Sequence, residues 1–312
     1  MATRSNRIDD GHPISVVVRR TGLTQDILRA WEKRYKAIVP RRTPTGRRLY
    51  SEDQVQMLRL LKQLVQGGRR ISDVAELDLG ALQRLADEDA SEAVLPAVAT
   101  PRRETRGFLA ASLEAIERLD RPALEQALDT ASVALSRPRL RSEVLVPLIQ
   151  EVGRRWQAGH WRIVHEHLAT AVLRSFLWAM WRRAEPGAEG AAIVVATPAG
   201  QHHELGALLV AGIVADLGWR VVYLGCDLPA EEIAAAAAAS HVQAVLLSVV
   251  YPLHDPRLTE EIRRLRQLVG PYLPLVAGGR AAFNSREEMK ASGVTVADDL
   301  EDLGPILESF RK

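Results

Sequence analysis

From residue 191 onward the chain alternates short β-branched runs with helical segments, and this alternation constrains the fold more than any other feature. The expected strands are nearly continuous apolar runs at 191–197, 220–225, 244–250, 273–279 and 294–297. The expected helices lie at 204–217, 230–239, 256–269 and 285–291, with a last one near 300–310. Such strands are buried on both faces, which predicts a parallel sheet covered by helices on both sides. Five units favour a flavodoxin-like, doubly wound domain, whose ligands bind at the carboxyl ends of the strands.

Chemically informative residues follow three of these strands. His203 and Gly206 come after the first, Ser248 ends the third, and Gly278 and Gly279 end the fourth. An imidazole can ligate a transition metal, and glycines let a long ligand tail approach the backbone. The absence of a GxGxxG motif after the first strand disfavours a dinucleotide. A surface histidine in an ordinary α/β domain is the alternative interpretation.

The middle of the chain, residues 105–184, contains four helical patterns joined by short breaks, which favours a four-helix bundle. Within it, nine residues separate Trp156 from the pair Glu166 and His167. Packing and hydrogen bonding explain such a pattern as readily as ligand binding does. A zinc site is not expected, because the histidines of this segment do not share one helical face with a carboxylate triad.

The charge distribution is strongly asymmetric. Residues 1–70 carry 16 Lys and Arg against 6 Asp and Glu, whereas the remaining residues carry 25 against 33. The formal net charge of +2 therefore hides a basic head and an acidic body. This asymmetry is expected when one end of a protein contacts a polyanion.

The basic head contains the pattern of a helix-turn-helix. Gly22 breaks a first helical run, and Thr24 is a plausible N-cap for a second helix whose inner face is Ile27, Leu28 and Trp31. The second helix would present polar and basic residues to a major groove and its phosphates. These residues are Thr24, Gln25, Arg29, Lys33 and Arg34.

A predicted wing follows the second helix. Pro40, Pro44 and Gly46 mark a tight turn, and four arginines crowd around it: Arg41, Arg42, Arg47 and Arg48. Such a loop would lie over the DNA backbone, with Tyr50 adding a phosphate contact or a packing contact. A helix from about Glu52 to Gln66 comes next. A solvated basic surface on a small helical domain is the alternative.

Composition excludes several classes of protein. The chain of 312 residues is 47% apolar and 26% charged, as expected for a soluble protein of two or three domains. No apolar run reaches the roughly 18 residues needed to span a bilayer. Residues 1–10 are polar and do not resemble a secretory signal, and the single cysteine, Cys226, cannot close an intramolecular disulfide. We therefore expect a cytoplasmic protein that makes no membrane contact.

The strings LRAWEKRY and PRRTPTGRRLYSEDQV resemble the DNA-binding head of the MerR superfamily, over roughly residues 12–75. This resemblance implies a winged helix-turn-helix that binds double-stranded DNA. Members of the superfamily usually continue into a long dimerising helix. Here the segment that follows the head is short and acidic and then contains prolines, so we interpret it as a linker. The expected division is a head at 1–78, a linker at 79–104, a bundle at 105–187 and an α/β domain at 188–312.

The motifs of the α/β domain resemble the cobalamin-binding domain of methionine synthase, corrinoid carrier proteins and certain mutases. That family's pattern is Asp/Glu-x-His-x-x-Gly, then a Ser, then Gly-Gly, which His203, Gly206, Ser248 and Gly278-Gly279 match. The resemblance implies that His203 is the lower axial ligand of cobalt and that the glycines admit the cofactor's tail. Two positions depart from the pattern. Gln201 replaces a carboxylate that would make the imidazole more basic, and Val250 replaces the usual Thr or Leu.

The three parts together resemble the CarH/LitR group of light-sensing repressors. This resemblance implies that adenosylcobalamin lies between bundle and α/β domain, with Trp156 capping the adenosyl group and Glu166 and His167 lining the upper pocket. It further implies a homotetramer, a dimer of dimers, that binds operator DNA in the dark and dissociates when light breaks the cobalt–carbon bond. The sequence therefore predicts a regulator and no enzymatic activity.

Other interpretations remain open at this point. Members of the group with a bis-histidine light product carry His after the Trp, whereas this chain has Gln157, so the cobalt keeps water or takes another histidine, with His160 as first candidate. The protein could also sense cobalamin supply or a second chromophore. A corrinoid methyl carrier or mutase subunit is the enzymatic alternative, although it has no use for a basic head. An α/β domain that has lost its cofactor is the third.

Overall fold

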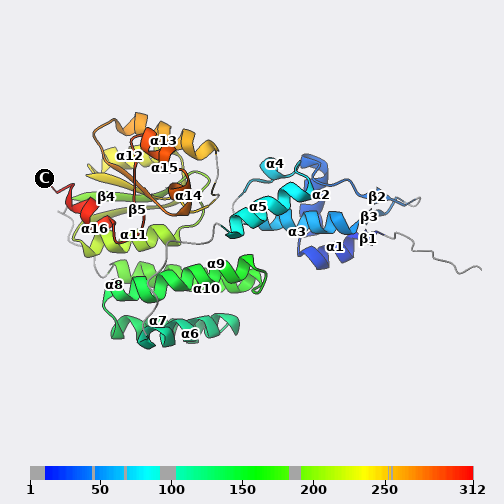
Figure 1. Ribbon diagram of the computed structural model, residues 1–312, viewed down its shortest axis with the longest axis horizontal. Helices are drawn as coiled ribbons and strands as arrows, with labels where there is room; N and C mark the ends of the chain where they lie inside the picture. The colour runs from blue at the N-terminus through cyan, green and yellow to red at the C-terminus, as the bar shows by residue number, and fades with distance from the viewer. Residues whose placement is uncertain are drawn as a thin grey trace, which may run out of the picture. The chain divides into compact units, whose positions relative to one another are not determined.

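A computed structural model describes residues 11–43, 46–66, 69–91, 103–182, 191–251, 253 and 256–311. The chain forms two compact units, residues 1–91 and residues 92–312, which are described separately here. Pro44, at the expected tip of the wing, lies outside the described residues. The mixed fold of helices and one parallel sheet agrees with the predicted class (Figure 1).

The first unit begins with the predicted helix-turn-helix. Gly22 ends the first helix in the left-handed conformation at φ 65°, where a residue with a side chain would be strained. The Thr24 side chain caps the second helix by accepting a hydrogen bond from the backbone N–H of Ile27 at 3.2 Å. The helices are α1 (Ile14–Thr21) and α2 (Gln25–Tyr35).

A small antiparallel sheet and three further helices complete this unit. The sheet has the order β1-β3-β2, and its β2–β3 hairpin is the predicted wing. The core contains Leu28, Tyr50 and Leu58, none of which is exposed. The remaining elements are β1 (His12–Pro13), β2 (Arg41–Arg42), β3 (Arg48–Tyr50), α3 (Glu52–Gln66), α4 (Ile71–Val74) and α5 (Leu79–Ser91).

Two expectations for this unit differ from the structure. The sequence pattern places Ile27 on the inner face of α2, one turn before Trp31, but its side chain is 41% exposed and does not belong to the buried cluster of the head. The segment expected to start the linker at residue 79 forms helix α5 instead. Leu82 and Ala86, four residues apart on one helical face, are buried against the rest of the head.

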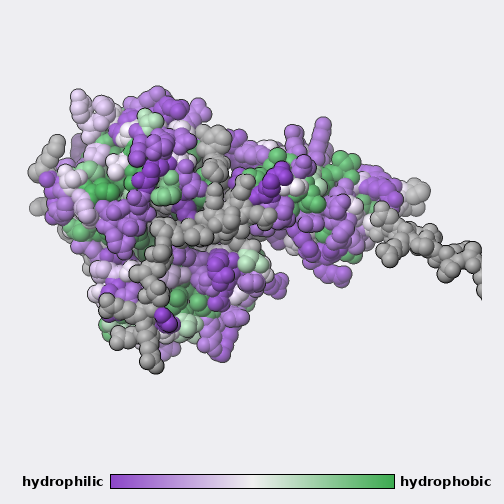
Figure 2. Space-filling view, viewed as in Figure 1, coloured by the Kyte–Doolittle hydropathy of each residue, from purple (hydrophilic) through white to green (hydrophobic). Residues whose placement is uncertain are grey.

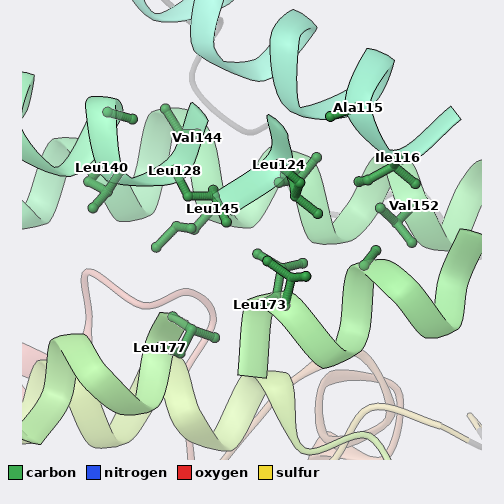
Figure 3. Close-up of a cluster of buried hydrophobic side chains, with 14 of the residues drawn as sticks. Ala115, Ile116, Leu124, Leu128, Leu140, Val144, Leu145, Val152, Leu173 and Leu177 are labelled. Atoms are coloured by element: carbon green, nitrogen blue, oxygen red, sulfur yellow. The ribbon is translucent and has the colours of Figure 1, made fainter. Parts of the chain in front are cut away.

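The second unit begins with the predicted helical bundle. Its helices bury a continuous apolar core in which Leu124 and Leu128 of one helix meet Leu173 and Leu177 of another (Figure 3). The elements are α6 (Arg103–Glu117), α7 (Arg121–Ala134), α8 (Arg137–Leu140), a π-helical segment (Arg141–Leu145), α9 (Val146–Gln157) and α10 (Ile163–Arg182).

A five-stranded parallel sheet follows, with the order β5-β4-β6-β7-β8, which is the flavodoxin-like order expected from the sequence. Helices α11 and α16 cover one face, and α12, α13 and α15 cover the other (Figure 1). The strands are β4 (Ala192–Pro198), β5 (Arg220–Leu228), β6 (Ala244–Ser248), β7 (Leu275–Gly278) and β8 (Thr295–Val296). The helices are α11 (Leu205–Asp216), α12 (Ala230–Ala239), α13 (Pro256–Val269), α14 (Arg280–Asn284), α15 (Arg286–Ala291) and α16 (Leu303–Glu308).

The bundle packs directly on the α/β domain through α10 and α11. Leu208 and Leu209 of α11 belong to the same buried cluster as the bundle core. At the far end of α11, Asp216 pairs with two bundle arginines, at 2.6 Å with Arg137 and also with Arg141, whose side chain is only 10% exposed. Apolar burial and these ion pairs together fix the bundle on one face of the sheet domain.

Hydrophilic side chains spread over most of the face in Figure 2, and hydrophobic ones form separate spots among them. Within the described ranges, no helix combines the length and the apolar character that crossing a bilayer requires.

Candidate functional site

The loop after β4 carries Gln201 and is tied to its surroundings on several sides. The Gln201 side chain is 1% exposed, and its Oε1 accepts hydrogen bonds from the backbone N–H groups of Val250 at 2.9 Å and Tyr251 at 3.0 Å. Its backbone carbonyl accepts hydrogen bonds from the Thr197 hydroxyl and from the backbone N–H of Asp227. The loop therefore has a defined conformation at the carboxyl edge of the sheet, where ligands of this fold bind.

His203 lies two residues later, where part of its side chain reaches solvent and the surrounding protein crowds the rest. Its imidazole stands in an edge-to-face arrangement with Tyr251, at 5.9 Å between centroids and 72° between planes. It makes no hydrogen bond to any residue that the structure describes. Desolvation by the surrounding protein lowers the pKa of His203, and the Glu166 carboxylate partly opposes this shift. A neutral imidazole with free nitrogens is suited to metal ligation.

The glycines and the serine of the predicted motif are brought together beside this loop. A Cβ atom on Gly206 would lie 2.6 Å from Ser248 Oγ and 3.7 Å from Val250 Cγ2. A Cβ atom on Gly279 would lie 3.3 Å from the same Val250 methyl, and Gly279 has φ 103°. Gly278 pairs in register with Ser248 on the neighbouring strand. These residues form one surface from which side-chain bulk is excluded.

Helix α10 extends beyond the start of α11 and carries two of the predicted site residues. Arg174 of α10 pairs at 2.5 Å with Glu204, immediately before α11. Glu166 lies eight residues earlier on the same helical face, about 12 Å further along the axis at 1.5 Å per residue. Its carboxylate is held at 2.6 Å from His167 Nδ1 and at 2.7 Å from the hydroxyl of Thr170.

Trp156 and His160 lie near the turn between α9 and α10. Trp156 is half-buried in the last turn of α9, and His160 is exposed in the turn after it. Within the described part of the chain, no hydrogen bond or ring contact joins either of them to His203. The turn itself is packed by Trp161, which stacks on His165 at 5.7 Å and lies under the Arg155 guanidinium at 4.9 Å.

Two residues of this site belong to no motif in the sequence. Tyr251 is 4% exposed and stands beside the imidazole of His203. Asp227, at φ 60° near the end of β5, accepts a hydrogen bond from Gly200 N at 2.7 Å and lies 3.5 Å from His202 Nδ1. No local motif marks either residue, because their partners are 27 to 50 positions away in the chain. Asp227 is unusual in its backbone, as a non-glycine residue at positive φ, but that feature is visible in the coordinates and not in the sequence.

The predicted DNA-contacting residues at α2 are accessible to a ligand. Thr24, Gln25, Arg29, Lys33 and Arg34 are all exposed, and Gln25, Arg29 and Lys33 follow one another at four-residue spacing along one side of the helix. The Arg29 side chain lies 3.4 Å from the Gln25 amide oxygen and 3.9 Å from Asp26. Basic and amide side chains on an N-capped helix match the chemistry of phosphates and base edges.

The arginines of the wing are exposed at three positions, Arg41, Arg42 and Arg47. Glu32 of α2 pairs with Arg48 at 2.8 Å and with Arg42 at 3.8 Å, and these contacts join the wing to the helix. The hydrogen bond to Glu32 raises the pKa of Arg48. Tyr50 is fully buried, which leaves packing and excludes the phosphate contact that was the other expectation. Desolvation raises the pKa of Tyr50.

The expected cobalamin can be tested against these residues. The side chains that the structure describes include no group of three or more His, Cys, Asp or Glu arranged to hold a metal ion. A cofactor that carries its own cobalt needs only one axial ligand, which His203 can supply. Gly206 packs closely on Ser248 Oγ and Gly279 on the Val249 carbonyl oxygen, so neither position can carry a side chain, and the buried Gln201 Nε2, which lacks a partner among the described residues, fits a polar group of a ligand tail. The residues present fit the group.

Comparison with protein families assigns each part of the chain. Residues 13–79 match the MerR HTH family regulatory protein, residues 109–178 match a B12 binding domain found in the helical segment, and residues 191–302 match the B12 binding domain of the α/β segment. The three matches follow the order of the head, the bundle and the sheet domain.

Whole-chain relatives combine the same parts. The HTH-type transcriptional repressor CarH of Myxococcus xanthus is 32% identical over 97% of this chain and 98% of its own. The HTH-type transcriptional repressor CarA of the same organism is 29% identical over 96% of both chains. Among solved structures, the monomethylamine corrinoid protein of Methanosarcina barkeri matches with a TM-score of 0.54 at 16% identity, over 65% of this chain and 97% of that one. This last match supports the fold alone.

Proposed function

Because the chain belongs to the family of CarH-type repressors, cobalamin-binding transcription regulators with a MerR-type DNA-binding head, we propose that it is a light-responsive repressor. In this proposal it binds adenosylcobalamin, assembles into a homotetramer and binds operator DNA in the dark, and light releases it. The two relatives that match along the whole chain are repressors, which favours regulation over catalysis.

The observation that carries the proposal is that one chain combines a DNA-binding type of helix with a candidate cobalamin site. The first unit exposes cations and amides on a capped recognition helix. The second unit presents the imidazole of His203 at the carboxyl edge of the sheet, with no hydrogen bond to a described residue, and the bundle packs on the same domain through α10 and α11. This packing supports a ligand site that involves both the bundle and the α/β domain.

In the proposed complex His203 would ligate the cobalt, and the cofactor's tail would be accommodated by Gly206, Ser248, Val250, Gly278 and Gly279. Trp156, Glu166 and His167 would line the rest of the pocket, and the hydrogen bonds of Glu166 to His167 and Thr170 fix its carboxylate. When bound, adenosylcobalamin supplies a cobalt–carbon bond that absorbs visible light and breaks. A change in the size of the bound cofactor near Glu166 would therefore act on α10, the helix that carries Glu166 and contacts α11.

Assembly explains how a ligand on the body controls a head that it does not touch. A single head neutralises few phosphates, whereas several heads on one particle multiply the contacts and raise affinity by orders of magnitude. A ligand that favours one assembly state therefore sets DNA occupancy by shifting a population.

The proposal is tested by reconstituting the full chain with adenosylcobalamin in darkness. Absorption spectrum, molecular mass and retention of operator DNA are then recorded before and after green light, with the operator first selected from random DNA. We expect uptake, a larger particle in the dark, and loss of mass and DNA affinity on illumination. His203→Ala should lose the imidazole-ligated spectrum, and His202→Ala, its exposed neighbour, is the matched control. Absence of uptake refutes the proposal. Uptake without any change in mass or affinity leaves a cobalamin sensor that does not respond to light.

The ligand above the cobalt after illumination is a separate part of the proposal. Since Gln157 follows Trp156, a histidine in that position is absent, and His160 in the adjacent turn is the proposed replacement, with water as the alternative. A spectrum of illuminated protein with two imidazole ligands should disappear in His160→Ala. Persistence of that spectrum in the variant contradicts the role of His160.

A further inference from the structure

The carboxamide of Gln201 is oriented by its surroundings. Its Oε1 accepts two backbone N–H groups, from Val250 and Tyr251, at 2.9 and 3.0 Å. A flipped amide would place an NH₂ group against two donors, so the assignment of oxygen and nitrogen is settled by the partners. Both acceptor directions of this oxygen are thereby used. The remaining Nε2 can only donate, and it cannot accept the N–H of an imidazole.

The consequence concerns His203, for which the family pattern provides a carboxylate at position 201. With the amide oxygen committed to the loop after β6, Gln201 offers no acceptor to the imidazole of His203. Asp227, a carboxylate beside the same loop, accepts the Gly200 N–H at 2.7 Å and lies 3.5 Å from His202 Nδ1, and no carboxylate among the described residues is hydrogen-bonded to His203. His203 therefore requires another source of orientation.

Tyr251 supplies that orientation. Gln201 fixes its backbone N–H, and its ring, 4% exposed, stands edge-to-face with the His203 imidazole at 5.9 Å. Aromatic pairs in this geometry contribute a directional attraction beyond simple burial. A continuous path thus leads from the Gln201 amide through the backbone at 250–251 and the Tyr251 ring to the His203 ring.

We propose that Gln201 is a positioning residue that acts on His203 only through Tyr251, and that the imidazole is held by an aromatic contact instead of a carboxylate. The inference rests on the proposed function in taking His203 as the cobalt ligand. An imidazole without a carboxylate partner is less basic, so it binds cobalt more weakly than a carboxylate-paired one. With Gln201 in place of a carboxylate, the surroundings of His203 orient its imidazole but do not make it more basic.

The first test uses the full chain without cofactor. The ring current of Tyr251 shifts the proton NMR signals of His203, and the size of this shift is given by the difference between wild type and Tyr251→Leu. We expect Gln201→Met, which has similar length but lacks the amide oxygen, to abolish most of the shift. Tyr251→Phe keeps the aromatic ring, so it should keep the His203 shift. Gln201→Asn, one methylene shorter, is the second variant should the first not fold. Tyr272→Leu, at a residue 95% exposed, is the matched control. An unchanged His203 shift in the folded Gln201 variant overturns the proposal.

The second test measures dissociation of cobalamin from the single and double variants. Gln201→Met and Tyr251→Leu should each weaken binding about 10-fold, within the range known for residues that orient metal-binding histidines. The double variant should also lose about 10-fold, because both changes break one path. A loss near 100-fold in the double variant, or no loss in Tyr251→Leu, refutes the shared path. Failure of wild type to bind cobalamin refutes the proposed function alone, since the NMR test still decides the role of Gln201.

Discussion

The ion pairs at the end of α11 allow a quantitative prediction about how the bundle is held on the sheet domain. Asp216 is 19% exposed and pairs with Arg141, 10% exposed, and with Arg137, 37% exposed. Asp216→Asn leaves the nearly buried Arg141 guanidinium without a carboxylate. Removing one partner of a buried pair costs about 3–5 kcal/mol, and partial solvent access here reduces the expected loss to about 2–3 kcal/mol. The exposed Arg137 pair accounts for under about 1 kcal/mol of this.

The order of the variants tests that reasoning. Arg137→Met should cost at most about 0.5 kcal/mol, and Arg141→Met about 1–2 kcal/mol, since Asp216 then still has one partner. The free energy of unfolding is measured by urea titration with tryptophan fluorescence, which mainly reports the second unit because it contains five of the six tryptophans. The melting temperature of Asp216→Asn should fall by about 4–12 °C for a unit of this size.

A matched control neutralises an exposed pair in the same unit. Glu114 and Arg118 pair on the surface of α6 at 59% and 70% exposure, so Glu114→Gln should change stability by less than about 0.5 kcal/mol. If Arg137→Met or Glu114→Gln destabilises the protein as much as Asp216→Asn does, burial does not decide the strength of these pairs and the reasoning is refuted.

Three further predictions concern the core, the DNA interface and the response to acid. Leu128→Ala, at a fully buried position of the bundle, should lower the free energy of unfolding by about 2–5 kcal/mol in the same titration. Val133→Ala, at an exposed position of the same helix, should have almost no effect. Lys33→Gln should weaken DNA binding uniformly across sequences and reduce the salt slope of log K by about 1, and Lys290→Gln, outside the head, should leave the slope unchanged. The hydrogen bond from Arg20 holds the pKa of Glu52 at about 2, against an ordinary 4.5, so its stabilisation of the head is present above pH 4.5 and is lost as the pH falls toward 2. Amide NMR signals of residues 11–66 should therefore show a shallower acid loss in Glu52→Gln, and an identical acid profile would contradict the assignment.

The sheet domain was the most predictable part of the fold. Strands with β-branched residues on both faces have few alternatives to a covered parallel sheet, and the order β5-β4-β6-β7-β8 follows from that pattern. The position of His203 at the sheet edge follows in turn. The contacts of His203 could not be predicted in the same way, because Gln201 is bonded to residues 49 and 50 positions away and nothing near Tyr251 in the sequence marks it.

Local sequence patterns did not predict the structure where the same residues are compatible with two local structures. The acidic segment after residue 79 resembles a linker, yet Leu82 and Ala86 at helical spacing suffice to bury one face of α5. Ile27 has the hydrophobicity of a core residue and lies one turn before Trp31, yet it is 41% exposed and outside the buried cluster of the head. In both cases burial depends on which other elements pack against the helix, and the hydropathy of single residues does not encode that packing.

Helix α10 is one uninterrupted element of 20 residues, so Glu166 and Trp181 lie on a single rod about 22 Å apart along its axis. Trp181 is wedged at the sheet end beside Tyr223 and Trp178, with centroids 6.0 and 4.5 Å away. Between these two residues, Leu173 and Leu177 are buried in the bundle core, so the helix is held along its length and not only at the aromatic end. A shift of its first turn would therefore have to move the helix as one body, with the bundle core and the ring contacts adjusting together.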